Sequence, residues 1–140
     1  MHLFVLAVLA VCGLFTLLLG IAHFFFPLLL DFATAIPRQG ASLKPFRLGP
    51  IRYATQRGDV YGISWVMNHA ASYTLVSIGL VDLAAVAWLD TPVAPWLSLC
   101  IAGWWFLRAG SQLYLGRRRG DWLILAGFAW LGLIHVGVAL

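Results

Sequence analysis

Residues 62–83 read GISWVMNHAASYTLVSIGLVDL, an apolar run that is long enough to cross a bilayer and that carries Asn68 and His69 well inside it. A membrane-spanning helix needs about 20 mostly apolar residues. A polar or ionisable side chain within such a helix needs a partner or a function, because the hydrocarbon offers it no hydrogen bond. The run therefore predicts a membrane helix with a polar side that faces other helices.

The composition extends this prediction to the whole chain. Of the 140 residues, 62% are hydrophobic and 10% are charged, whereas a soluble domain has roughly 45–50% apolar and about 25% charged residues. Four runs of spanning length use most of the chain, and they cover residues 3–30, 60–89, 92–115 and 122–140. We therefore expect a single all-α domain over residues 1–140, an integral membrane four-helix bundle with no separate soluble module.

The positions of the basic residues predict the orientation of this bundle. All Lys and Arg residues except Arg108 lie in the connections 31–59 and 116–121, namely Arg38, Lys44, Arg47, Arg52, Arg57, Arg117, Arg118 and Arg119. The connection 90–95 and both termini have none. Basic connections favour the cytoplasmic side of a membrane. We therefore expect both termini to be extracytoplasmic, in a bacterial-type inner membrane, and no nucleic-acid partner.

The connection 31–59 mixes basic and apolar residues. Pro37, Pro45 and Pro50 prevent a long helix there, while Phe46, Ile51 and Tyr53 alternate with Lys44, Arg47 and Arg52. Such a mixture suits the anionic inner surface of a bilayer. We interpret the segment as a loop that lies on lipid and sets the topology, with a lid over the cytoplasmic mouth of the bundle as the alternative.

The first run contains GIAHFFFPLLLD, residues 20–31, in which Pro27 follows His23 by four residues. A proline inside a helix removes one hydrogen bond and clashes with the carbonyl four residues earlier, which here belongs to His23. One interpretation is a kinked helix whose freed carbonyl is satisfied by a neighbouring helix, by water or by a ligand. The other is a helix that ends near Phe26 and brings His23 to the cytoplasmic interface.

Polar residues recur at helical spacing in the second run. Ser64, Asn68 and Ser72 are four residues apart, as are His69 and Tyr73. Residues at this spacing lie on one side of a helix. Because polar packing between membrane helices accounts for Ser64 and Ser72, we take Asn68 and His69 as the stronger functional candidates.

The third run carries a cation at depth. Arg108 shares a helix face with Ser111 and Gln112, and we find no acidic residue at the same depth in any run. Its long stem allows the guanidinium to reach the cytoplasmic surface, and the alternative is that it meets an anionic group of a lipid or ligand. We expect Asp82 at the outer interface, and His135 in the outer half of the membrane, packed with a hydroxyl or water away from the other polar residues.

These positions predict one shared cavity. At 1.5 Å per residue, His23, His69 and Arg108 lie roughly 10–14 Å from the cytoplasmic ends of their runs. Consecutive spans of a bundle are neighbours, so the first three runs can bring these residues to one polar, cytoplasm-facing cavity. The candidate ligand-binding residues are His23, Asn68, His69, Tyr73, Arg108 and Gln112.

Three functions are compatible with such a cavity. The first is binding or movement of a small anionic or amphiphilic ligand, with Arg108 opposite its negative group. The second is a b-type haem protein with His23 and His69 as axial ligands. The third is a membrane enzyme that uses His69 as acid or base on a lipid-like substrate.

The expected partners are the lipid bilayer and this small ligand, and the small residues of the runs also allow a homo-oligomer. No non-haem metal site is expected, because two imidazoles are a poor ligand set for a catalytic metal. A purely structural histidine pair is the alternative to all three functions.

Overall fold

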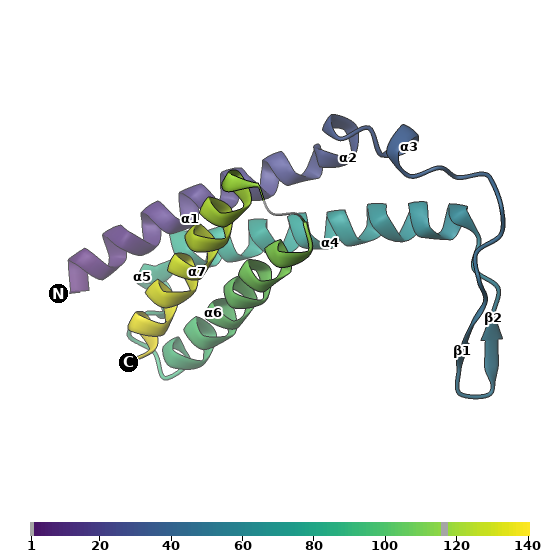
Figure 1. Ribbon diagram of the computed structural model, residues 1–140. Coiled ribbons are helices and arrows are strands. Elements are labelled where there is room, and N and C mark those ends of the chain that lie inside the picture. The colour runs from purple at the N-terminus through teal and green to yellow at the C-terminus, as the bar shows by residue number, and fades with distance from the viewer. Residues whose placement is uncertain (1, 116–117) are drawn as a thin grey trace. The chain divides into compact units, whose positions relative to one another are not determined.

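The computed structural model describes residues 2–115 and 118–140, so that Arg117 lies outside the described residues. The described chain is mostly helical, which confirms the all-α prediction (Figure 1). Its elements are α1 (His2–Phe24), α2 (Phe26–Leu29), α3 (Phe32–Ala35), β1 (Phe46–Leu48), β2 (Ile51–Tyr53), α4 (Arg57–Leu83), α5 (Ala85–Trp88), α6 (Ala94–Ser111), the 3-10 turn η1 (Gln112–Tyr114) and α7 (Arg119–Ala139).

Two of the described helices, α1 and α7, are long and apolar enough to cross a membrane by length and composition. The other two predicted spans correspond to α4, which carries the polar residues discussed above, and to α6, which has 18 residues. The four-span bundle therefore stays a prediction.

The chain divides into two compact units. One unit consists of Met1–Gly13 with Val81–Leu140, and we call it the terminal unit; the other consists of Leu14–Leu80, and we call it the central unit. Both α1 and α4 contribute to each unit. The prediction of a single domain stays a prediction.

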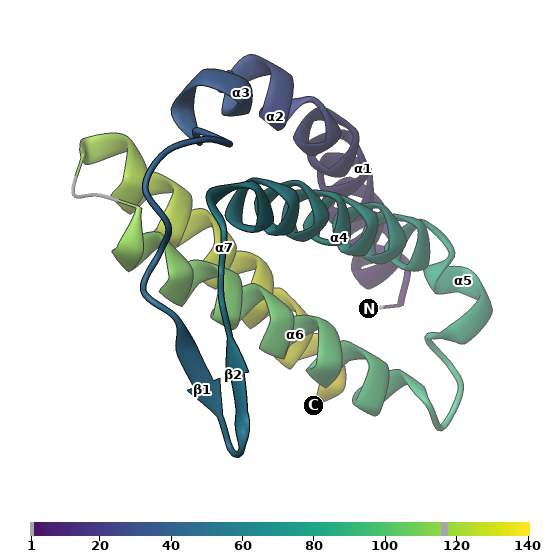
Figure 2. The same cartoon turned by 90° about the vertical axis from the view of Figure 1, so that its right-hand side faces the viewer.

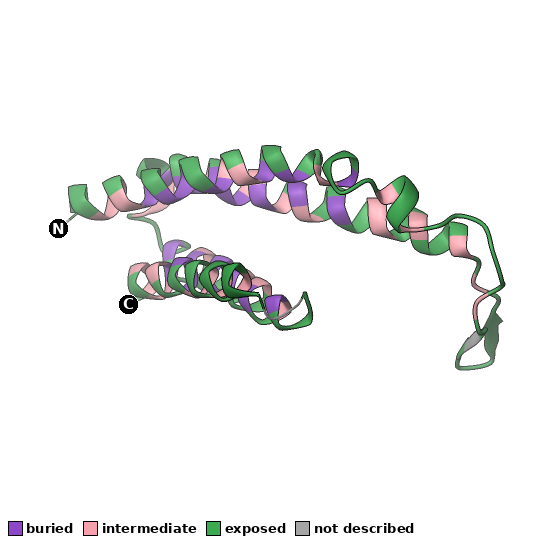
Figure 3. Cartoon of the chain, turned by 45° about the horizontal axis from the view of Figure 1, so that its top comes forward, coloured by how far each residue is buried: buried purple, intermediate pink, exposed green. Residues whose placement is uncertain are grey.

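In the central unit, α1 and α4 lie side by side (Figures 1 and 2). Buried positions recur at spacings of three and four residues and appear as purple bands along the helices (Figure 3). They include Thr16, Gly20 and His23 on α1, followed by Pro27 on α2, and Asn68, Ser72, Leu75 and Gly79 on α4, where Ile78 is buried as well. This seven-residue repeat is the pattern of two helices that pack along a narrow seam. Small residues in the seam allow close approach, as is common between membrane helices.

The two helices approach each other closely at Gly20 in the central unit. A Cβ atom built on Gly20 would lie 2.7 Å from the backbone nitrogen of Val76 and 2.9 Å from Cβ of Leu75. Neither is the flexible end of a side chain, so a larger residue would force the helices apart.

The structure combines parts of the two interpretations of Pro27, because α1 ends just before it while the carbonyl of His23 is satisfied by the neighbouring helix. The helix stops at Phe24, a turn follows at Phe25, and Pro27 stands in the first turn of α2. A first-turn position suits proline, because the missing N–H would have no intrahelical partner there. The next helix break follows at once, where Asp31 adopts a φ of 45°.

The connection after α3 contains a β-hairpin, which the sequence analysis did not foresee. Strands β1 and β2 are antiparallel, with Phe46 opposite Tyr53, Arg47 opposite Arg52 and Leu48 opposite Ile51. The two turn residues are Gly49, with a φ of +59°, and Pro50. A positive φ at the first turn residue is what a two-residue hairpin requires, and glycine supplies it without strain.

In the terminal unit, α6 and α7 form an antiparallel helical pair (Figures 1 and 2). Trp105 on α6 packs against Phe128 on α7 with ring centroids 5.3 Å apart. Gly132 faces the ring of Phe106, which would lie 2.8 Å from a Cβ atom at that position. These contacts fix the level at which the two helices meet.

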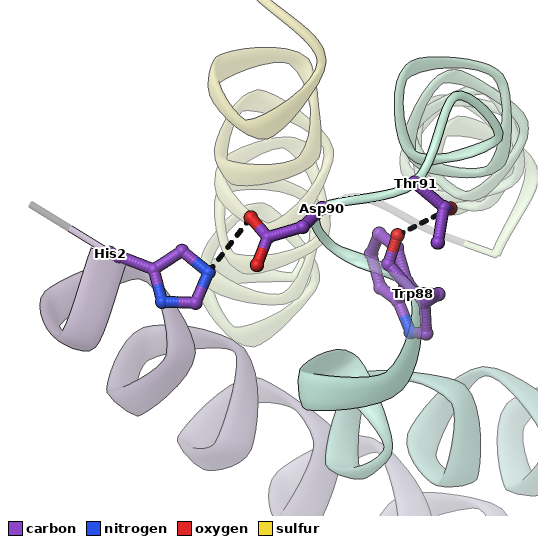
Figure 4. A network of polar contacts seen from close by, with 4 residues as sticks. All are labelled: His2, Trp88, Asp90 and Thr91. Carbon is purple, nitrogen blue, oxygen red and sulfur yellow. Dashed lines mark hydrogen bonds and ion pairs between the residues drawn. The ribbon is translucent and has the colours of Figure 1, made fainter.

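The start of α6 differs from the expectation. Helix α6 begins at Ala94 with Pro95 in its first turn, two residues after the start of the predicted run at Pro92. Thr91 does not cap it, because its Oγ1 donates a hydrogen bond to the carbonyl of Trp88 at 2.6 Å (Figure 4).

An ion pair lies beside Thr91. Nε2 of His2 lies 3.1 Å from Oδ1 of Asp90, so the N-terminal end of α1 contacts the connection before α6.

Candidate functional site

The first polar cluster lies in the seam of the central unit, at the break in α1. The carbonyl of His23, which Pro27 cannot serve, accepts a hydrogen bond of 3.0 Å from Nδ2 of Asn68. This hydrogen bond satisfies the carbonyl that Pro27 leaves without an intrahelical donor. A buried carbonyl without a donor costs about 1–3 kcal/mol. Asn68 is buried, as a side chain with this role must be.

Ser72 completes this cluster and contacts both Asn68 and His23. Its Oγ donates to the carbonyl of Asn68 at 2.7 Å and lies 3.3 Å from Nδ1 of His23. A hydroxyl has a single proton to donate. Since that proton is directed to the carbonyl of Asn68, the hydroxyl can accept a hydrogen bond from His23 in the tautomer that carries its proton on Nδ1. We call these three residues the seam cluster.

The other two candidates on α4 lie outside the seam. His69 is exposed, and its ring contacts are with Trp65, at a centroid distance of 5.4 Å, and with Phe24, at 5.8 Å. Tyr73 is 70% exposed. The predicted polar side of α4 therefore divides into a buried pair, Asn68 and Ser72, and an exposed pair.

The candidates on α6 belong to the terminal unit. Nη1 of Arg108 donates to Oγ of Ser111 at 2.8 Å, and the guanidinium lies 5.4 Å from the centroid of Phe128. Within the described residues Arg108 forms no salt bridge. Gln112 is buried at the end of α6. The prediction that Arg108 and Gln112 share a cavity with His23, Asn68 and His69 stays a prediction.

A second polar site, which the sequence analysis missed, lies in the core of the terminal unit. Nε2 of His135 on α7 lies 3.5 Å from Oδ2 of Asp82 at the end of α4, and neither side chain has exposed surface. Neither carboxylate oxygen of Asp82 and neither ring nitrogen of His135 makes a hydrogen bond to a described residue. The sequence predicts a hydroxyl or water as the partner of His135, and the structure instead places Asp82 beside it; the position of Asp82 at the outer membrane interface stays a prediction.

Two further buried polar groups lie on the face of α6 that packs against α7. The hydroxyl of Ser98 and Nε1 of Trp105 are buried and make no hydrogen bond to a described group. Ser98 precedes Trp105 by seven residues, and His135 follows Phe128 by seven. Seven residues are about two turns, or roughly 10 Å. Because Trp105 packs against Phe128 and the helices are antiparallel, Ser98 and His135 lie at about the same level.

The terminal unit thus brings a carboxyl, an imidazole and a hydroxyl into one apolar core, and we call Asp82, Ser98 and His135 the core site. The same three groups make up a nucleophilic triad. A nucleophile, however, must be hydrogen-bonded to its base, and the Ser98 hydroxyl makes no such bond to His135. Proton exchange between the carboxyl of Asp82 and the imidazole of His135 likewise needs a hydrogen bond, which their 3.5 Å contact becomes when the two atoms approach by a few tenths of an ångström.

The described neighbours of the pair include one further titratable group and several uncharged ones. Cys12, on α1, interacts electrostatically with Asp82. The packed face of α6 presents Ser98, Ile101, Ala102 and Trp105, which carry no charge. Within the described residues no Arg, Lys or second carboxylate pairs with either member. A buried carboxylate and imidazole without hydrogen bonds is costly for stability, and such costs are typical of functional sites.

The sequence does hold a signal for Asp82. Asn68, Leu75 and Asp82 are spaced by seven residues, so that Asp82 continues the buried face of α4 on which Asn68 and Ser72 lie. Distance from the helix end suggested an interface, whereas the seven-residue repeat indicates burial. No comparable signal joins His135 to Asp82, because the contact depends on how α7 packs.

Comparison of the chain with protein-family models, with curated proteins and with solved structures found no match. Among the described residues no group of three or more His, Cys, Asp or Glu side chains is arranged to hold a metal ion.

Proposed function

We propose that this chain is an integral membrane protein of four helical spans that moves protons across the bilayer, with the Asp82–His135 pair as its proton-binding site. The observation that carries the proposal is the 3.5 Å contact between two side chains that have no exposed surface and no hydrogen bond to a described group. Ionisable residues within membrane helices are rare, and chains of acidic residues and histidines are typical of proton relays.

The membrane placement is supported by where the apolar side chains lie. Only 28% of the most apolar stretch of α1 and 22% of that of α7 is buried within the structure. A core helix of a soluble protein would have most of this surface covered. Large side chains such as Leu3, Val11, Leu123 and Trp130 are instead 65–81% exposed. Hydrocarbon would cover this surface, and α4 and α6 would supply the two remaining spans.

The contact between His2 and Asp90 supports the proposed topology. It joins the N-terminal end of α1 to the connection between α5 and α6, as expected if both lie on the same side of the bilayer. The basic connections 31–59 and 116–121 would then be cytoplasmic and both termini extracytoplasmic, in a bacterial-type inner membrane.

A proton is the ligand that the pair can bind without rearrangement of the helices. Imidazole and carboxylate can share one proton either as an ion pair or as two neutral groups, and the equilibrium belongs to the pair. No other hydrogen bond within the described chain fixes either state, so the proton can lie on either group. The hydroxyl of Ser98 offers a further donor and acceptor at this level.

A second candidate function is binding of a small anion or amphiphile by Arg108. It is favoured by the partial burial of this guanidinium in an apolar helix, where no described carboxylate forms a salt bridge with it. Native mass spectrometry of the detergent-purified protein tests it, since a bound acid or lipid lost in Arg108→Gln would support this candidate. The absorption spectrum of the same sample tests the haem alternative, and a Soret band lost in His23→Ala would support that one.

The proton proposal is tested in proteoliposomes that contain a pH-sensitive dye. A potassium gradient with valinomycin sets an inside-negative potential, and dye fluorescence reports proton entry. We expect wild-type vesicles to acidify faster than protein-free vesicles, and Asp82→Asn and His135→Gln to reduce the rate to that of protein-free vesicles. The matched control is Asp90→Asn, which removes the exposed carboxylate that faces His2 and should leave the rate unchanged.

Two results would overturn the proposal. Wild-type vesicles that acidify no faster than protein-free ones would exclude proton conduction by this chain. Rates in both Asp82→Asn and His135→Gln that equal the wild-type rate would exclude the pair as the site. Circular dichroism and gel filtration of each variant establish that a lost rate does not reflect a lost fold.

A further inference from the structure

The hairpin of β1 and β2 has two chemically different faces. Side chains alternate between the faces of a strand, so the pairing places Arg47 directly opposite Arg52 on one face. Leu48 and Ile51 are opposite one another on the other face, together with Tyr53. These three apolar and aromatic residues are 66%, 53% and 44% exposed.

Each face of the hairpin requires a binding partner outside the hairpin. Like charges directly opposite one another on a sheet are destabilising, and within the described residues neither arginine forms a salt bridge. A two-stranded hairpin is only marginally stable in water unless its apolar face packs against another surface. The arginine pair requires anions, and Leu48 with Ile51 requires an apolar surface.

The surrounding segment has the charge of an anion-binding surface. From residue 32 to residue 58 the sequence has no Asp or Glu, while it carries Arg38, Lys44, Arg47, Arg52 and Arg57. Two of these cations hold the segment to the start of α4. Arg38 lies 3.9 Å from the centroid of the Tyr61 ring, and Nε of Arg57 donates to the carbonyl of Ala41 at 3.2 Å.

We propose that the hairpin docks onto an anionic phospholipid bilayer with its Gly49–Pro50 turn toward the lipid, so that Leu48 and Ile51, next to the turn, reach the boundary between headgroups and acyl chains and Arg47 and Arg52, one residue further from the turn, bind lipid phosphates. Positive charge without acidic neighbours complements the anionic leaflet, and interfacial segments bury apolar side chains at this depth. The inference rests on the membrane placement proposed above, but not on proton movement.

Hydrogen exchange of the full-length protein in lipid nanodiscs tests this docking. One set of nanodiscs contains phosphatidylcholine alone, and the other also contains phosphatidylglycerol. We expect amide exchange in residues 44–55 to be slower in the anionic discs by up to about 30-fold, the effect expected of two basic residues at an anionic surface. The same segment should lose this protection in Arg47→Gln/Arg52→Gln and in Leu48→Ser/Ile51→Ser.

The matched control is Arg118→Gln/Arg119→Gln, which removes the same charge from the other basic connection and should leave exchange in residues 44–55 unchanged. Equal exchange in the two kinds of disc would overturn the docking inference while leaving the proposed function standing. Protection that survives the loss of Arg47 and Arg52 would overturn it as well. Failure of the wild-type protein to co-elute with nanodiscs would instead overturn the membrane placement itself.

Discussion

Replacement of both Asp82 and His135 by apolar residues should leave the free energy of unfolding unchanged or raise it. At an effective dielectric constant of about 20, two unit charges at the 3.5 Å separation of Asp82 and His135 attract by about 5 kcal/mol. Burial costs several kcal/mol for each ion, and no hydrogen bond to a described group offsets that cost here. Attraction and desolvation therefore roughly cancel, or desolvation wins.

The prediction compares single and double variants. Asp82→Val alone leaves His135 buried without a counter-ion, and His135→Leu alone leaves Asp82 in the same state; each should lose about 3–5 kcal/mol. The double variant Asp82→Val/His135→Leu should lie within about 1 kcal/mol of wild type or be more stable by about 1–4 kcal/mol. The free energies are measured by SDS titration in dodecyl maltoside, with circular dichroism as the readout.

The exposed pair of His2 and Asp90 is the control for this comparison. Its side chains are 52% and 78% exposed, so the coupling between His2→Gln and Asp90→Asn should be close to zero. A double variant of the core pair that loses as much stability as the two single variants together would refute the reasoning, because the pair would then be part of the packing and not a site retained for its chemistry.

Further predictions concern the seam of the central unit and its break. Asn68→Ala should lower the free energy of unfolding by about 1–3 kcal/mol, because the carbonyl of His23 loses its donor. In the Pro27→Ala background the backbone N–H of residue 27 can donate to that carbonyl, so the loss measured by thermal unfolding should be smaller. An equal loss in both backgrounds would contradict the role assigned to Asn68. Gly20→Ala should destabilise by about 1–3 kcal/mol, because its Cβ would meet the backbone of Val76. Gly62→Ala, whose Cβ would meet no atom within 4 Å, should be neutral or stabilising by up to about 1 kcal/mol; equal effects of the two alanines would contradict the close approach.

The sequence allowed the helical class and the break at Pro27 to be predicted, because each follows from a local rule. An apolar run predicts a helix, and a proline frees a carbonyl wherever it stands in one. The need for a donor to the carbonyl of His23 could be stated in advance, and Asn68 was identified as a polar residue that faces another helix. That these two residues meet could not be derived, since it depends on the rotation of α1 against α4.

Other features depend on which partner a residue meets in the folded chain, and a single sequence does not show this. Thr91 has the side chain of a helix cap, but it bonds to the carbonyl of Trp88, and α6 starts at Ala94. The strands flanking Gly49 and Pro50 have only three residues each, and their alternation of apolar and basic residues is equally typical of a loop that lies on lipid. Asp82 was assigned by its distance from the helix end, whereas its burial follows from packing against α7.

The central claim is that the buried pair exchanges a proton, and infrared difference spectroscopy of the reconstituted protein tests it most directly. The account predicts a pH-dependent change in the carboxyl or imidazole bands that disappears in Asp82→Asn and His135→Gln and persists in Asp90→Asn. A spectrum in which Asp82→Asn and His135→Gln give the same difference bands as wild type would contradict the account, because the pair would then hold its proton permanently.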